Sequence, residues 1–158
     1  MRHCVTYIRR KKTEISSKML YNIPVFTRAA AKDTKLGITL DISHWCNVHE
    51  SYLEDQAPAV QKALTHTRHL HARIGHTQSA QVNDPRAPEW KDTVQKFYSW
   101  WDKLLLLQSK KNKPFTITTE FGPFPYMPEA PYTRKALADQ WELNVFMLKT
   151  LQKRYKHI

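Results

Sequence analysis

The sequence contains few of the residues on which several common classes of protein depend. Its 158 residues include only two cysteines, Cys4 and Cys46, which cannot form a disulfide framework, so we expect a reduced, cytoplasmic protein. It has three glycines, and no glycine-rich loop follows a predicted strand, which removes the dinucleotide-binding fingerprint. No apolar run approaches the roughly 20 residues of a membrane span. The N-terminus also has no apolar stretch typical of a signal peptide, so we expect no membrane partner.

Acidic residues are also scarce, with 14 Asp and Glu against 25 Lys and Arg, a formal net charge of +11. Residues 1–18 hold six basic residues against Glu14, a net +5, so nearly half of the excess lies in one short segment. We interpret this segment as basic and irregular, followed by a single domain over 19–158. A phosphate-binding surface is the alternative for 1–18, but the uneven distribution does not favour nucleic acid as a partner.

Short β-rich runs alternate with helical patterns through the rest of the chain. The pattern predicts buried strands at 37–43, 69–74 and 115–120. Ser51 and Glu54 form a capping-box pattern ahead of a helix. A long helix with one apolar face is predicted from Trp90 to Leu105 and ends near Lys110–Pro114. The apolar faces expected for the first and last helices consist of Ala57, Val60, Ala63 and Leu64, and of Leu137, Trp141, Val145, Leu148 and Tyr155.

The alternation of strands and helices indicates an α/β fold with a parallel sheet. Upstream, 4–8 has the pattern of another strand and 24–32 that of a helix, while the proline-rich stretch 122–131 must be a loop. An open sheet and part of a β/α barrel both fit this order. The missing glycine-rich loop favours the barrel.

Polar residues stand where the predicted strands end. Asp41 and His44 follow the first strand, His71 and Arg73 end the second, and Glu120 ends the third. Because the carboxyl ends of barrel strands converge on one axis, we expect Asp41, His71 and Glu120 to form a divalent-metal site. Carboxylate and imidazole ligands suit Mn²⁺, Zn²⁺, Co²⁺ or Mg²⁺. For Asp41, capping of a turn is an equally weighted alternative.

Several segments, taken in order, resemble the xylose-isomerase-like superfamily of sugar phosphate isomerases and epimerases. They are 40–45, 47–56, 69–75, 84–90, 118–123 and 138–142. The resemblance implies a TIM barrel, but such (β/α)8 barrels have eight strands and about 250 residues. We therefore expect the C-terminal half of a barrel, about four βα units. A truncated or frame-disrupted form of a longer protein would explain the missing strands.

The resemblance also implies roles for individual residues. Asp41, His71 and Glu120 match the second, third and fourth metal ligands of the superfamily, and Glu14 is the candidate for the first. His44 matches a substrate-contacting histidine, and Arg86 lies in a loop that holds substrate residues in related proteins. We add Arg73 to the substrate-binding set because of its place at a strand end, and assign proton transfer to Glu120 with Glu14 as its partner.

The expected function is thus metal-dependent isomerisation or epimerisation of a sugar or sugar phosphate. Two alternatives stay open: nucleic-acid processing similar to that of apurinic endonucleases, which the charge favours, and a half-barrel without catalytic activity. Activity of this chain alone is not assured by the sequence. A half-barrel has open sheet edges, so we expect a homo-oligomer or a separate N-terminal half to complete it.

Overall fold

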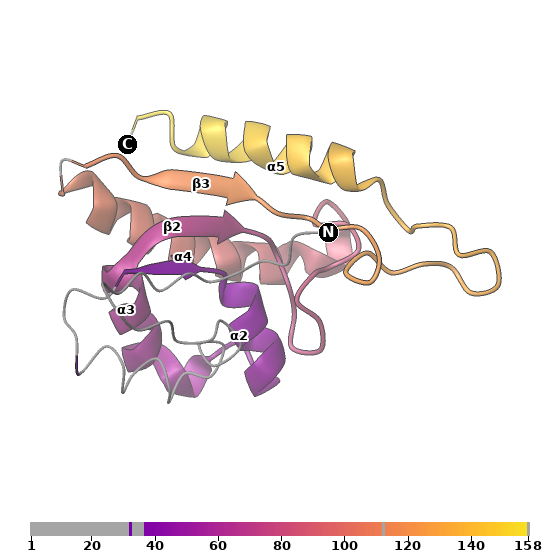
Figure 1. The fold of residues 1–158 in the computed structure, drawn as a ribbon, viewed down its shortest axis with the longest axis horizontal. Helices are drawn as coiled ribbons and strands as arrows, with labels where there is room; N and C mark the ends of the chain where they lie inside the picture. The colour runs from indigo at the N-terminus through magenta and orange to yellow at the C-terminus, as the bar shows by residue number, and fades with distance from the viewer. Residues whose placement is uncertain (1–31, 33–36, 112, 158) are drawn as a thin grey trace.

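The computed structural model describes residues 32, 37–111 and 113–157, and it is a mixed α/β structure built on a three-stranded parallel sheet (Figure 1). The predicted basic segment 1–18 with Glu14, the predicted strand 4–8 and, apart from Lys32, the predicted helix 24–32 lie outside the described residues. The described elements, in chain order, are β1 (Ile38–Leu40), α2 (Ile42–His49), the short 3-10 helix η2 (Glu54–Gln56), α3 (Ala57–His66), β2 (Thr67–Ala72), the 3-10 helix η3 (Pro88–Trp90), α4 (Lys91–Ser109), β3 (Thr116–Thr119) and α5 (Gln140–Arg154).

The sheet has the sequential order β1-β2-β3, and both neighbouring pairs are parallel. Each parallel pair is joined by a helix, α3 between β1 and β2 and α4 between β2 and β3. These two helices contact each other, as expected when successive right-handed crossovers lie on one side of a sheet. The last helix, α5, lies along β3 (Figure 1).

The hydrophobic core fills the space between the sheet and these helices. Strand β2 contributes Leu70 and Ala72, both fully buried, because alternate side chains of a strand point to the same face. Helix α4 covers them with a broad buried face, which confirms the face predicted from its 3.6-residue spacing. The largest core side chains on α4 are Phe97 and Trp101, each 0% exposed.

The predicted first strand is too long, because the strand ends at Leu40 and a helix follows at once. Asp41 is the N-cap of α2, and its carboxylate accepts a hydrogen bond from the Ser43 amide at 3.1 Å. A capping carboxylate satisfies an amide that has no partner within the helix, so it favours helix over strand from Ile42 onward. Helix α2 was missed because its apolar residues merge with those of the strand.

Three other predictions also change. The second strand starts earlier than predicted, at Thr67, and ends at Ala72. The capping box does not start a helix at Ser51: its hydroxyl accepts from the Leu53 amide at 3.3 Å, and α3 begins at Ala57 with a proline in its first turn. The apolar face predicted for the last helix is wrong. Leu143, Met147 and Leu151 are its buried residues, and most of the predicted face is exposed.

No helix in the described part of the chain is long and apolar enough to cross a membrane.

Candidate metal centre

Three potential ligands meet at the carboxyl ends of the strands. Asp41 directly follows β1, His71 lies near the end of β2, and Glu120 directly follows β3. Each offers one ligand atom, and these atoms lie within 4.8 Å of one another. The parallel register explains the meeting, since His71 is paired with Thr118, two residues before Glu120. The structure therefore brings together the three residues that the sequence nominated.

Asp41 is the most buried of the three, with 2% of its surface exposed. One carboxylate oxygen, Oδ1, accepts from the Ser43 amide and, at 2.5 Å, from the Ser43 hydroxyl. The other, Oδ2, accepts from Nη2 of Arg73 at 2.6 Å. Burial raises the pKa of Asp41, but the charges of Arg73 and His44 and the Ser43 hydrogen bond outweigh it and hold the pKa below its ordinary value. Asp41 is consequently both a helix cap and an ionised carboxylate at the site, so the two interpretations of it are compatible.

His71 and Glu120 are in direct contact, through Nδ1 of the imidazole and Oε2 of the carboxylate. Both side chains are partly accessible, His71 at 14% and Glu120 at 23%. These two candidate ligands are therefore partly accessible to solvent, whereas Asp41 is buried. The ring of His69 lies edge-on to that of His71, at 5.1 Å between centroids, and its Nδ1 pairs with the Thr116 hydroxyl at 2.6 Å.

Arg73 and His44 form a second layer beside Asp41. Nη2 of Arg73 donates to Nε2 of His44 at 2.6 Å, and because arginine cannot accept, the ring proton of His44 must be on Nδ1. Burial is the main cause that lowers the pKa of His44; Asp41 opposes it and Arg73 adds to it. His44 is consequently a neutral imidazole at physiological pH.

Arg73 was predicted to bind substrate, but its side chain is only 1% exposed. The guanidinium is enclosed by Asp41, His44 and the ring of Tyr126, whose centroid lies 4.5 Å from it. In this arrangement Arg73 positions the two residues that it contacts and has little surface for a substrate. Tyr126 was not singled out from the sequence, because a tyrosine in a proline-rich loop carries no signal of its own.

Two side-chain amides, from buried Gln81 and half-buried Asn144, fix the segment that carries Glu120. Gln81 accepts from the Gly122 amide at 2.7 Å and donates to the Gly122 carbonyl at 3.1 Å. Asn144 makes the same pair of bonds to Phe121, accepting at 2.9 Å and donating at 2.8 Å. The backbone after Glu120 is thus held from two sides, by the loop after β2 and by α5. Sequence reasoning missed both residues, since isolated amides follow no spacing rule.

Arg86, the third predicted substrate residue, is engaged away from the three ligands. Its guanidinium bonds Asp84 at 2.7 to 3.1 Å, lies 3.9 Å from Glu142 and stacks over Phe146 of α5. The hydrogen bonds from Arg86 lower the pKa of Asp84, which keeps it ionised and paired. A substrate role for Arg86 stays a prediction.

The donor chemistry of the site suits a divalent cation. Two carboxylates and one imidazole provide hard oxygen and intermediate nitrogen, the set that Mn²⁺, Co²⁺, Zn²⁺ and Mg²⁺ accept. Two carboxylates would also balance the charge of such an ion. Among the described residues this is the one group of three or more such side chains close enough to share an ion. No family model, curated protein or solved structure compared with the chain matches it.

Proposed function

We propose that the chain is the C-terminal half of a β/α barrel that holds a divalent metal ion and isomerises or epimerises a sugar or sugar phosphate. The observation that carries the proposal is the convergence of Asp41, His71 and Glu120, from three successive parallel strands, within 4.8 Å. Active sites at the carboxyl ends of strands are the rule in such barrels, where each strand supplies a residue to a common axis.

The order of the strands supports the barrel over an open, doubly wound sheet. A doubly wound sheet reverses its strand order at the point where ligands bind. Here β1, β2 and β3 follow one another without reversal, and α3 and α4 contact each other. In the wall of a barrel each new strand is added to the same edge of the sheet, and the connecting helices lie on one side. The order of β1, β2 and β3 follows this pattern.

The proposed chemistry is the movement of a proton at a carbon next to a carbonyl. A bound divalent ion would act as a Lewis acid toward the substrate oxygens. Glu120 accepts the proton from the hydroxyl-bearing carbon and returns it to the neighbouring carbonyl carbon, while the hydroxyl proton passes to the former carbonyl oxygen, so that carbonyl and hydroxyl exchange positions. His71 holds the Glu120 carboxylate by their direct contact. Epimerisation would need a second acid on the opposite face of the carbon, and Glu14, outside the described residues, is the candidate.

The supporting residues keep these groups in place. Arg73 fixes Asp41 and the tautomer of His44, so His44 can orient a substrate oxygen as a neutral group. Nucleic-acid processing by a larger metal cluster is less well supported, since the Asp84 carboxylate is taken up by Arg86. We therefore do not advance that alternative.

Metal binding is the first test, and it needs no knowledge of the substrate. We expect the purified chain to bind Mn²⁺ or Co²⁺ with one-to-one stoichiometry in a calorimetric titration. Asp41→Asn, His71→Ala and Glu120→Gln should each weaken binding at least about tenfold, the scale of a lost ligand or its support. His69→Ala is the matched control, since it removes an imidazole from the same face of the same strand. Equal affinity in the parent and all three ligand variants would refute the site.

Turnover is the second test. The chain, alone and with Mn²⁺ or Co²⁺, is assayed against a panel of ketoses and ketose phosphates, with aldose formation and epimer formation measured separately. We expect Glu120→Gln to abolish any conversion, because an amide cannot accept the proton. Metal binding without conversion of any sugar would contradict the activity while leaving the metal site intact.

A further inference from the structure

The large apolar side chains that remain exposed are concentrated at one end of the chain. Of the seven in the described part, five lie between residues 124 and 148. They are Phe124, Tyr132, Leu137, Trp141 and Leu148, with exposed fractions of 54, 102, 53, 75 and 48%. Isolated exposed apolar residues are normal, but a contiguous group marks an interaction surface.

Two of these five residues, Trp141 and Leu148, lie on helix α5. Trp141, Val145 and Leu148 are spaced i, i+4 and i+7 and so form one stripe along the helix. Leu143, Met147 and Leu151 form a second stripe, which is buried against the rest of the domain. A helix that is apolar on two faces needs a neighbour on each of them.

Helix α5, which carries the exposed stripe, lies beside an edge strand of the described sheet. Helix α5 contacts β3, and β3 is an edge strand of the described sheet. Two of the four residues of β3, Thr116 and Thr118, are exposed. Helix α5 and the edge strand thus lie side by side (Figure 1).

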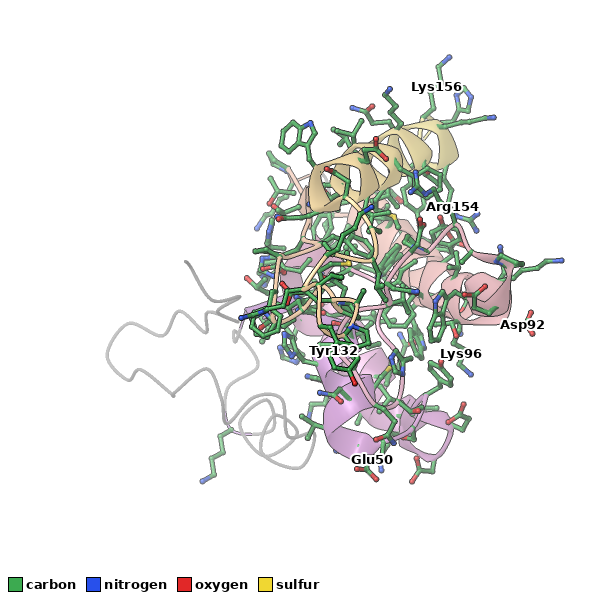
Figure 2. The ribbon with its side chains drawn as sticks, turned by 90° about the vertical axis from the view of Figure 1, so that its right-hand side faces the viewer. Glu50, Asp92, Lys96, Tyr132, Arg154 and Lys156 are labelled. Carbon is green, nitrogen blue, oxygen red and sulfur yellow. The ribbon has the colours of Figure 1, made fainter. Side chains whose placement is uncertain are left out.

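The charges along α5 are separated by sign. Its N-terminal turn carries Glu142, preceded by the N-cap Asp139, whereas its C-terminal half carries Lys149, Lys153 and Arg154. Figure 2 shows Arg154 on the helix and Lys156 pointing away beyond its end. A second α5 that runs antiparallel would place acidic turns beside basic ones and would oppose the two helix dipoles.

We propose that this surface joins two copies of the chain, with the α5 helices packed antiparallel across a two-fold axis. A two-fold contact uses the same patch on both subunits, so the patch must be complementary to itself. The apolar stripe meets its own copy, and an axis near Val145 sets Glu142 of each copy beside Lys149 of the other. The proposal is independent of the metal centre, whose ligands all come from one copy.

Sedimentation equilibrium of the full chain tests the contact. We expect a reversible monomer–dimer equilibrium, and Trp141→Asp and Leu148→Asp should each raise the dissociation constant at least about tenfold, as for residues central to an interface. Leu106→Asp is the matched control, because Leu106 is 57% exposed on α4 and lies outside the stripe. Circular dichroism melts confirm that each variant is folded. The proposal is overturned if the parent chain stays monomeric, because the stripe is then covered by another part of its own chain. It is also overturned if the Trp141→Asp variant dimerises as strongly as the parent.

A charge exchange tests the antiparallel alignment. Glu142→Lys and Lys149→Glu each place like charges together across the axis, so each should weaken the dimer several-fold at low salt. The double variant restores opposite charges and should dimerise nearly as well as the parent. A head-to-tail contact, in which β3 of one copy pairs with β1 of the next, would keep Glu142 and Lys149 apart. No recovery in the double variant would therefore refute the antiparallel α5 contact.

Discussion

Replacement of Arg73 by glutamine should destabilise the protein, because it removes one partner of a buried ion pair. Arg73 and Asp41 have side chains 1% and 0% exposed, and they are joined at 2.6 Å. Removing one partner of a buried ion pair leaves the other charge without compensation, which costs about 3–5 kcal/mol. We expect Arg73→Gln to lower the free energy of unfolding by this amount, because a neutral amide cannot replace the guanidinium charge beside the buried Asp41 carboxylate.

A divalent ion should recover part of that loss. An ion held by Asp41, His71 and Glu120 would supply the positive charge that Arg73→Gln removes. The rise in melting temperature on addition of Mn²⁺ should therefore be larger for Arg73→Gln than for the parent. At roughly 3 °C per kcal/mol for a domain of this size, the variant itself should melt about 10 °C lower without metal.

A double-mutant cycle decides whether the pair is the cause. Urea unfolding is measured for Arg73→Gln, Asp41→Asn and the combination. Since the double variant has no buried charge at this place, it should be more stable than Arg73→Gln alone. If the two single effects add, Arg73 contributes by packing under Tyr126 and not by neutralising Asp41, and the reasoning about charge is refuted.

Three further predictions concern stability and reactivity. A Cβ at Gly75 would lie 2.8 Å from two backbone oxygens, so Gly75→Ala should lower the free energy of unfolding in urea by about 1–3 kcal/mol. The Cβ of Gly122→Ala would meet only the Tyr126 ring, at 3.0 Å, so this substitution should cost less. Hydrogen bonds from Arg154 and Tyr155 lower the pKa of Asp102. The ionised carboxylate therefore stabilises the fold fully above the ordinary pKa of 3.8. This stabilisation is lost as the pH falls through the lowered pKa. Asp102→Asn, at an exposed pair, should thus cost under about 1 kcal/mol at neutral pH and nothing once the parent carboxyl is protonated. Burial raises the pKa of Cys46 to about 12, so in a Cys4→Ser chain the thiol should react with a disulfide reagent only after unfolding, and rapid reaction of the folded chain would contradict its burial.

The convergence of the three candidate ligands could be predicted because it follows a rule that strand order alone imposes. Each of Asp41, His71 and Glu120 stands at or just after the end of a strand, and parallel strands bring these ends to one edge. The spacing along the chain does not matter for such a rule, so a single sequence is enough. The residues around them could not be predicted in the same way, because Gln81, Asn144 and Tyr126 act through loop backbone whose path no periodic pattern encodes.

The length of the first strand was wrong for a related reason. Ile38 to Ile42 is a continuous apolar and β-branched run apart from Asp41, and a run of this kind has no internal marker of a change from strand to helix. The decisive interaction is the short hydrogen-bonded turn from Asp41 to Ser43, together with the pull of Arg73, which is distant in the sequence. The β propensity of the run therefore gave way to a helix cap at Asp41, which Arg73 supports.

The rotation of α5 shows most clearly what a helical pattern leaves open. Apolar residues occupy 141, 143, 145–148 and 151, so more than one stripe fits the same segment, and the stripe that includes Trp141 has the largest single side chain. Polar contacts accompany the observed rotation at both ends of the helix. Asn144 bonds the backbone of Phe121 near the start, and Arg154 and Tyr155 bond Asp102 of α4 near the end.

In this rotation Leu143, Met147 and Leu151 are buried, and Trp141 is left 75% exposed. Burying an indole would gain roughly 3 kcal/mol or more on the scale of large core side chains, which a monomer of this shape forgoes. The polar contacts hold the segment after Glu120 and tie α5 to α4, so rotating α5 to bury the indole would release both. The same hydrogen bonds that fix the candidate site therefore also create the surface that we propose for a second copy. Loosening α5 with Asn144→Ala should accordingly weaken both metal binding and dimerisation, measured by calorimetry and sedimentation, while Trp141→Asp should affect dimerisation alone.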